Sequence, residues 1–262
     1  MNRDNVAILA ILTPRTNRLK VATPICVGNT HLLFNTKRGD IKLAQLAHLF
    51  AEIDRIAIGT DCRLPVVLCG DFNSTPFSPL YNFLTKGELS FNGISKTVIS
   101  GQDDSPHRGA NFKLNDRIFP PDLGYTHDCR WKDLSKKQNH RHWFDQLRGV
   151  IDLTSDASNR KNIETDRPGI LTHNLDLSSS YMHRGLDGVK EVTTCHDRAS
   201  ATVDYIFHST GVNPQTESTH GQLWLSGVLS LLSEYDVKRM GKLPNTTISS
   251  DHLLLMSSFV LT

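Results

Sequence analysis

The 262-residue chain lacks the features that mark several specialised protein classes. No apolar run approaches the roughly 20 residues that a helix needs to cross a bilayer, so a membrane span is excluded. The chain shows no internal repeat and no pattern of a coiled coil or a collagen-like fibre. The formal net charge is only +2, which is too small for a polycation that wraps nucleic acid. A local phosphate-binding groove remains compatible with this charge.

Cysteine is scarce and irregularly spaced. The five cysteines are odd in number and form no CxxC pair, which argues against a disulfide framework or a zinc knuckle. We therefore expect a reducing compartment and predict a cytoplasmic and/or nuclear location. Residues 6–12 are apolar like the centre of a signal peptide, but Asp4 and the lack of a small-residue cleavage site favour a β-strand.

The first half of the chain alternates strand and helix patterns. Apolar, β-branched runs predict strands over residues 6–12 and 25–33. Apolar residues at helical spacing predict a helix over 40–58, with Asp40 as its N-cap. A further buried strand over 65–69 runs into a loop, and a short helix opens at Ser78-Pro79. This order is typical of an α/β fold.

Periodicity disappears between about residues 102 and 190, where polar residues surround isolated aromatics. We predict a long, largely mobile insertion over this range. Strand-like runs return afterwards, at residues 192–195, 202–207, 223–232 and 253–260. We interpret them as one sheet system that the insertion interrupts, and residues 1–262 therefore as parts of a single domain.

Polar side chains follow or interrupt the predicted strands. Asp71 and Asn73 follow the strand at 65–69 with a spacing of two, so on an extended segment both point to one side. A carboxylate beside a neutral amide suits a hard divalent cation and a phosphate oxygen. Asp204 lies inside the apolar run TVDYIF, where burial is costly without a partner.

Two histidines complete this set of polar groups. His31 lies near the end of its strand, and His252 follows Asp251 directly before the last strand. A neighbouring carboxylate can orient an imidazole or bind a metal. Taken singly, each group is more often a turn residue, a cap after a loop or a hydrogen-bonded core residue than a catalytic one. Their joint occurrence at strand ends favours a site.

Four segments carry a family resemblance. They resemble, in the right order, the motifs of the endonuclease/exonuclease/phosphatase superfamily: NTHLL at 29–33, GDFNSTPFSPLY at 70–81, TVDYIF at 202–207 and SDHLLL at 250–255. Within it, residues 38–53 and 191–207 resemble the Angel proteins of the CCR4/nocturnin family. The resemblance implies an α/β fold, the four-layer α/β/β/α sandwich of this superfamily.

The resemblance also implies a role for each matching residue. His31 would bind or protonate at the scissile phosphate, and Asp71 would orient or deprotonate the attacking water. Asn73 would hold a phosphate oxygen in the transition state. Asp204 would support the network on the phosphate side, and His252 would stabilise the pentacovalent phosphate or hold the catalytic aspartate.

Three further residues belong to the predicted site. The resemblance implies that Asp251 would contact the metal or orient His252 and that Asn29 would bind substrate. Arg198, just before the Asp204 strand, could bind a terminal phosphate of the substrate, although a solvated turn is equally compatible with this position. The implied cofactor is Mg²⁺, with Mn²⁺ as an alternative, and the implied partner is an RNA 3′ end. We expect no membrane partner, and the sequence names no protein partner. Lys37, Arg38 and Lys42 could follow an RNA backbone, although charges at a helix start are more often solvated.

The chain departs from the family pattern at its beginning. Family members carry an upstream strand with an asparagine and another that ends in Gln-Glu, whose glutamate is the main Mg²⁺ ligand. Only 28 residues precede Asn29, and neither Glu52 nor Glu88 fits that position. We therefore expect the chain to be the C-terminal portion of the domain, incomplete at the N-terminus, with an uncovered apolar sheet face.

Three functions remain open on this evidence. The Angel resemblance implies hydrolysis of 2′,3′-cyclic phosphate termini of RNA, whereas the wider CCR4 group implies 3′–5′ exoribonuclease activity on poly(A). A non-catalytic remnant that binds RNA or a protein is the third, because the upstream glutamate is absent. We expect weak or absent activity for this chain alone.

Overall fold

The computed structural model describes most of the chain. The described residues are 4–15, 23–58, 63–102, 112–115, 117–132, 167–185, 187–197, 199–209 and 222–261. None of the described helices is long and apolar enough to cross a membrane.

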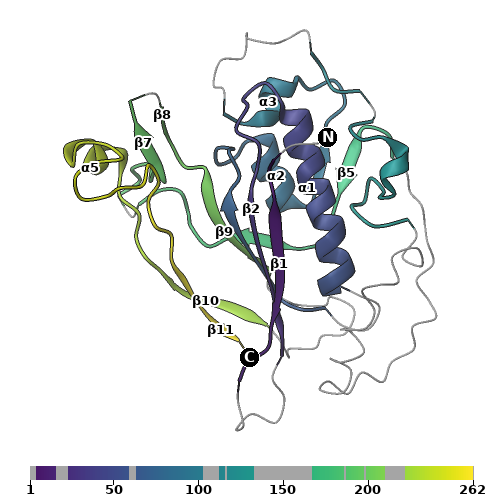
Figure 1. The fold of residues 1–262 in the computed structure, drawn as a ribbon, viewed down its shortest axis with the longest axis horizontal. Coiled ribbons are helices and arrows are strands. Elements are labelled where there is room, and N and C mark those ends of the chain that lie inside the picture. The colour runs from purple at the N-terminus through teal and green to yellow at the C-terminus, as the bar shows by residue number, and fades with distance from the viewer. Residues whose placement is uncertain are drawn as a thin grey trace.

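A five-stranded sheet organises the described residues (Figure 1). Its strands, in spatial order, are β1 (Ala7–Leu12), β2 (Ile25–His31), β3 (Val66–Asp71), β9 (Asp204–Ser209) and β6 (Leu177–Ser179). Strands β2 and β3 pair in parallel, and the other neighbours pair antiparallel. Three helices lie on one side of this sheet: α1 (Gly39–Ile53), α2 (Pro79–Lys86) and α3 (Lys96–Ser100). A π-helical turn, η1 (Asp54–Ile58), continues α1.

Smaller elements surround the sheet. They are three two-stranded ribbons and two short helices: β10 (Leu223–Val228) with β11 (Ser257–Leu261), β7 (Thr194–His196) with β8 (Ala199–Ala201), β4 (Glu88–Ser90) with β5 (Ile170–Thr172), η2 (Pro121–Leu123) and α5 (Glu234–Arg239). The β10–β11 ribbon, β7, β8 and α5 lie on the side of the sheet opposite the helices (Figure 1). Phe259 of β11 packs beside His208 of β9, with ring centroids 5.1 Å apart.

The hydrophobic core lies between the sheet and the helices. Because side chains alternate along a strand, Tyr205 and Phe207 of β9 share one face, and their rings stack at 5.1 Å. Phe72 meets Phe207 edge-on at 5.2 Å, and all three rings are buried. From the helical side, Phe50 of α1 contacts Phe83 of α2. The core therefore ties β3 and β9 to both longer helices.

Helix α1 begins one residue before the predicted start. Arg38 takes the N-cap position, and no side chain caps the helix. Asp40 lies in the first turn, where its carboxylate bonds to Arg38 and forms an ion pair with Lys96 of α3. The prediction of Asp40 as the N-cap is therefore wrong, because these two cations hold its carboxylate.

The range 102–190, which the sequence predicts as one mobile insertion, contributes to the fold where it is described. Strand β6 forms an edge of the main sheet, and β5 pairs with β4. Leu114, Tyr125 and Leu171 belong to the main core. Strands of three residues are too short to show a period in the sequence. For the same reason the sequence does not predict α3 and α5, which are helices of five and six residues.

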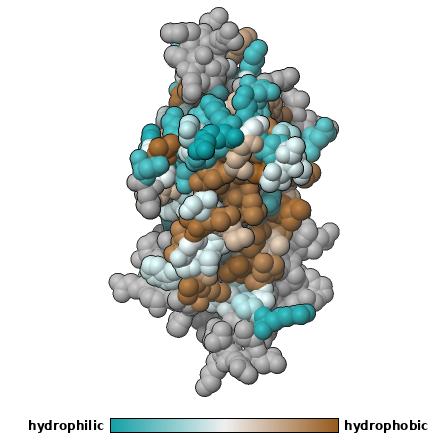
Figure 2. Space-filling view, turned by 90° about the vertical axis from the view of Figure 1, so that its left-hand side faces the viewer, coloured by the Kyte–Doolittle hydropathy of each residue, from teal (hydrophilic) through white to brown (hydrophobic). Residues whose placement is uncertain are grey.

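An apolar surface remains exposed on the side of the molecule that carries β10 and β11. Figure 2 shows hydrophobic side chains gathered there. Large hydrophobic side chains are exposed on β1, on the β10–β11 ribbon and beside both: Val6, Ile8, Leu12, Trp224, Leu225, Val228, Leu229, Leu254, Met256 and Val260. This observation agrees with the expectation of an uncovered apolar face.

Candidate active site

The register of three strands brings the first site residues together. His31 lies opposite Asp71 across the parallel β2–β3 pair, and Asp71 lies opposite Asp204 across the antiparallel β3–β9 pair. His31 Nε2 is 3.5 Å from Asp71 Oδ2. Gly70 lets the end of β3 lie close to the backbone of β2. Its φ is +138°, and a Cβ there would lie 1.9 Å from the Thr30 carbonyl oxygen. A backbone constraint thus fixes where Asp71 sits.

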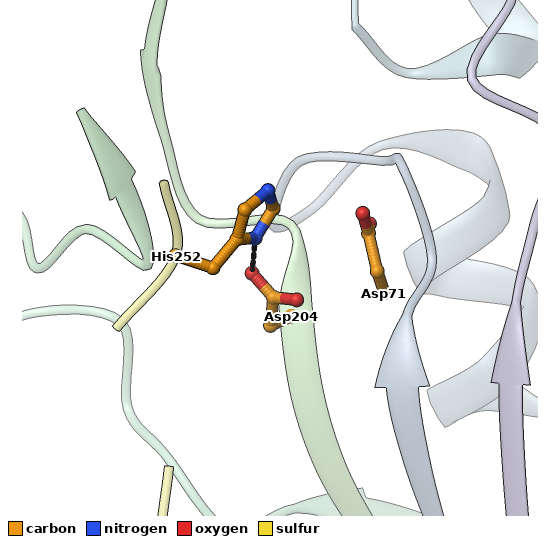
Figure 3. Close-up of side chains that lie close together, drawn as sticks. All are labelled: Asp71, Asp204 and His252. Carbon is orange, nitrogen blue, oxygen red and sulfur yellow. Dashed lines mark hydrogen bonds and ion pairs between the residues drawn. The ribbon is translucent and has the colours of Figure 1, made fainter. Parts of the chain in front are cut away.

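His252 joins the site from the other end of the chain. Its Nδ1 lies 2.7 Å from Asp204 Oδ2, and Asp204 stands between His252 and Asp71 (Figure 3). Two neighbouring residues, Thr193 and Thr194, hold the partners in place. Thr193 Oγ1 accepts the backbone N–H of Asp204, and a β-bridge joins Thr194 to His252.

The charges of the site influence one another. Burial raises the pKa of Asp71, and the nearby carboxylate of Asp204 raises it further. The hydrogen bond to Asp204 raises the pKa of His252, against the opposing effect of burial. Two facing carboxylates and an imidazole are therefore coupled in one place, which is typical of a reactive centre.

The same three side chains form a candidate metal centre. Asp71, Asp204 and His252 each offer one ligand atom, and these atoms lie within 4.8 Å of one another. Burial, and after it the charge of Asp204, raises the pKa of Asp71, and a bound cation would oppose both effects. Carboxylate oxygens are the ligands that hard divalent ions prefer. The donor set therefore fits a divalent cation.

Asn73 occupies the loop after β3 and is 97% buried, with 3% of its surface exposed. Its backbone N–H donates to Asp71 Oδ1 at 2.7 Å, and its Nδ2 donates to the Leu32 carbonyl at 3.0 Å. Its φ is +47°, a left-handed conformation that asparagine tolerates. Asn73 thus ties the ends of β2 and β3 together beside Asp71.

The structure places the remaining predicted residues around this centre. Asn29 is exposed on β2, two residues before His31, and so on the same side of the strand. Asp251 is exposed, and its backbone carbonyl accepts the Thr194 hydroxyl. The ring of His252 is held by Asp204 and not by Asp251. Arg198 lies outside the described residues.

Sequence reasoning misplaced one residue of this neighbourhood. Lys42, considered for the RNA backbone, is fully buried, and its ammonium contacts the Asn73 carbonyl at 2.5 Å. A signal was present, because Lys42 stands on the apolar side of α1, four residues before Leu46. Gln102 and Thr193, which also touch site residues, show no comparable signal in the sequence.

Comparisons with known sequences give a consistent result. A family model described as the Endonuclease/Exonuclease/phosphatase family matches residues 28–252. Protein angel homolog 2 of Bos taurus is 40% identical over 267 residues, which cover 99% of this chain and 48% of that protein. Protein angel homolog 1 of Homo sapiens is 36% identical, over 99% of this chain and 46% of that protein. The chain thus spans about half the length of these relatives.

A solved structure shows the same fold. The crystal structure of ANGEL2, described as a 2′,3′-cyclic phosphatase in complex with adenosine-2′,3′-vanadate, superposes with a TM-score of 0.76 at 39% identity. The match covers 99% of this chain and 62% of that one. The predicted α/β fold class and the resemblance to the Angel proteins are confirmed.

Proposed function

The chain belongs to the endonuclease/exonuclease/phosphatase family, and we propose that it is a metal-dependent phosphoesterase that hydrolyses 2′,3′-cyclic phosphate termini at RNA 3′ ends. The observation that carries this proposal is the Asp204–His252 pair facing Asp71 at the strand ends. The 39% identity to ANGEL2, whose described activity is that of a 2′,3′-cyclic phosphatase, supports the choice of substrate.

Asp71 is the proposed base of the reaction. Hydrolysis needs the oxygen of a water to bond to phosphorus while one bond between phosphorus and a ribose oxygen breaks. Asp71 accepts a proton from that water, and its raised pKa makes it a stronger base than an exposed aspartate. The departing ribose oxygen takes up a proton, so the overall reaction consumes one water.

His252 is the proposed cationic donor. Asp204 holds the imidazole through Nδ1, which leaves Nε2 as the atom that can donate to a phosphate oxygen. The same hydrogen bond raises the pKa of His252 and so favours the protonated ring. The Nε2–H group of His252 is then positioned to stabilise the negative charge that develops on the phosphate.

We assign Mg²⁺, with Mn²⁺ as the alternative, to the carboxylates of Asp71 and Asp204. A bound divalent ion would neutralise phosphate charge and polarise the attacked group. The roles of His31 and Asn73 at the phosphate, of Asn29 and Arg198 in substrate binding and of Asp251 toward the metal stay predictions. The cytoplasmic and/or nuclear location is also part of this proposal.

Exonucleolytic removal of adenylates is the competing activity, and it requires exposed rings on which bases can stack. Tyr81 does not meet this requirement, because it is 8% exposed and its hydroxyl lies 2.9 Å from His183 Nε2. Phe77, the second ring on the loop and helix that follow Asp71, is 66% exposed and could carry a stacked base, so Phe77 alone of these two rings supports the competing activity.

The test uses two RNA oligomers of one sequence, one ending in a 2′,3′-cyclic phosphate and one in an oligoadenylate tail with a free hydroxyl. The purified chain is incubated with each, in Mg²⁺ and in EDTA, and the ends are followed by mass spectrometry. We expect slow, Mg²⁺-dependent loss of the cyclic phosphate only. Asp71→Asn should reduce it by at least about a hundredfold, because both the base and a metal ligand are impaired.

Asp122→Asn is the matched control, since Asp122 is an exposed aspartate of η2 far along the chain from the site. It should turn over the substrate like the unaltered chain. Shortening of the oligoadenylate tail would identify an exoribonuclease. Binding of both oligomers without any turnover would identify a non-catalytic remnant.

A further inference from the structure

The buried ammonium of Lys42 is surrounded by acceptors only. Its Nζ contacts the Asn73 carbonyl oxygen at 2.5 Å, Ser100 Oγ at 2.7 Å and Gln102 Oε1 at 2.7 Å. The Ser100 carbonyl lies farther away, at 3.3 Å. An ammonium has three hydrogens and no acceptor, and three close oxygens use all of them. Asp71 is the carboxylate that acts on Lys42 through its charge.

This donor determines the direction of a chain of amides. Because Gln102 Oε1 accepts from Lys42, the other end of that amide must be the NH₂ group. Gln102 Nε2 then donates to Asn73 Oδ1 at 3.1 Å. The Asn73 oxygen is thereby used, and its Nδ2 donates to the Leu32 carbonyl. Lys42, at one end of this chain, can only donate, and the Leu32 carbonyl, at the other end, can only accept. The side-chain amides of Gln102 and Asn73 between them therefore have one orientation that satisfies every hydrogen bond.

The fold brings Lys42 to this place through a close contact of two helices. A Cβ at Gly39 would lie 2.3 Å from the Lys96 carbonyl oxygen and 2.5 Å from the Ser100 nitrogen. Glycine therefore lets the start of α1 press against α3. Lys42 lies one turn further along α1 and so meets Ser100 and Gln102 at the end of α3.

Packing alone does not explain a lysine at this position. Burial penalises the charged form strongly and lowers the pKa of Lys42 to about 7, and methionine would fill a similar volume without that cost. Methionine, however, cannot donate a hydrogen bond to the backbone carbonyl oxygen of Asn73 or to the side-chain oxygen of Gln102.

We propose that Lys42 and Gln102 are positioning residues that fix the side-chain amide of Asn73, so that Asn73 serves the site as a hydrogen-bond donor and never as an acceptor. Leu32 takes one of the two Nδ2 hydrogens, and the second is the group available to a phosphate oxygen. This role of Asn73 rests on the proposed function, whereas the fixed orientation does not.

The orientation is tested by NMR on the full ¹⁵N-labelled chain at pH 6, without any substrate. We expect two distinct, slowly exchanging signals for the Asn73 amide in the unaltered chain. Lys42→Met should accelerate their hydrogen exchange by about tenfold or more, since Gln102 is then free to turn. Lys96→Met is the matched control, because Lys96 pairs with Asp40 and does not contact Asn73. It should leave the signals unchanged.

Gln102→Glu covers the case in which Lys42→Met does not fold. The new carboxylate pairs with Lys42 but has no hydrogen to donate to Asn73. The chain should therefore stay folded while the Asn73 amide signals move and exchange faster. Unchanged Asn73 signals in the variants that fold, or exchange in the unaltered chain as fast as at exposed Asn35, would overturn the proposal.

The consequence for turnover is tested by a double-mutant cycle on the cyclic-phosphate oligomer. Gln102→Glu should lower kcat about tenfold with little change in KM, and the loss should shrink below about twofold in an Asn73→Ala background. Equal losses in both backgrounds would mean that Gln102 acts on something other than Asn73. If the unaltered chain shows no turnover, the proposed function fails, and the NMR result still decides the orientation.

Discussion

The two faces of the five-stranded sheet differ in what they carry. The face toward α1, α2 and α3 is filled by buried aromatic and aliphatic side chains, such as Phe72 and Phe207. The opposite face carries Asp71, Asp204 and the approaching ring of His252, and near it apolar side chains stay exposed (Figure 2). The same strands supply both faces, because successive side chains of β3 and β9 point to opposite sides.

One face of the sheet therefore stabilises the fold, and the other carries the candidate site. Groups that titrate and bind ions are costly to bury, so they stand on the face where burial is incomplete. The buried face then holds the strand ends in register. Lys42 is the exception that links the two faces, since its amine reaches from the helical layer to Asn73 in the site loop.

The largest expected effect on stability comes from removing a buried side chain on the face of the sheet that packs against the helices. Phe207→Ala removes a fully buried ring that contacts Phe72 and Tyr205, and it should lower the free energy of unfolding by about 3–5 kcal/mol. Phe34→Ala makes the same chemical change at a side chain that is 70% exposed, and it should cost less than about 0.5 kcal/mol. Urea unfolding of both variants measures the contrast. Similar losses would show that burial of the Phe207 ring does not stabilise the fold.

An intermediate effect is expected where charge is coupled on the open face. In the unaltered chain His252 should titrate above its ordinary pKa of 6.5, and in Asp204→Asn its pKa should be lower than in the unaltered chain, because the hydrogen bond and charge of Asp204 are lost while burial still lowers the pKa. The ring signals of His252 in an NMR titration, recorded in EDTA, measure both values.

The raised pKa of His252 also determines how the stability of the fold depends on pH. A raised pKa means that the His252–Asp204 pair stabilises the fold below pH 6.5, and that this contribution is lost as the pH rises through the folded-state pKa. The stability difference between the unaltered chain and Asp204→Asn should therefore shrink at alkaline pH. Lys42 is present in both the unaltered chain and Asp204→Asn, so its own titration does not contribute to their stability difference. A difference that grows with pH would contradict the assignment.

The smallest effect is expected on the exposed apolar surface. Trp224 is 56% exposed on β10, and Trp224→Ser should change the free energy of unfolding by less than about 0.5 kcal/mol while reducing self-association. Leu223→Ser, at the buried neighbour, should destabilise the chain by more. Urea unfolding and light scattering separate the two. A large loss of stability in Trp224→Ser would show that this surface is packed.

Much of the sheet could be predicted from the sequence because its strands are apolar and long enough to show a pattern. Residues 6–12 and 25–33 contain β1 and β2, and residues 202–207 overlap β9. The helix over 40–58 corresponds to α1 and its π-helical continuation. Strand β6 could not be predicted, because three residues carry no period and its place depends on pairing with β9.

The sequence by itself determined which residue types stand at the strand ends, since the motifs around Asp71, Asp204 and His252 are local and adjoin or interrupt apolar runs. Only the tertiary structure decided that Asp204, and not Asp251, holds the imidazole, and that Lys42 is buried against Asn73. The physical reason is that strand register and helix contacts join residues far apart in the chain. Local spacing shows which side of a strand a residue takes, but it does not show which partner it meets.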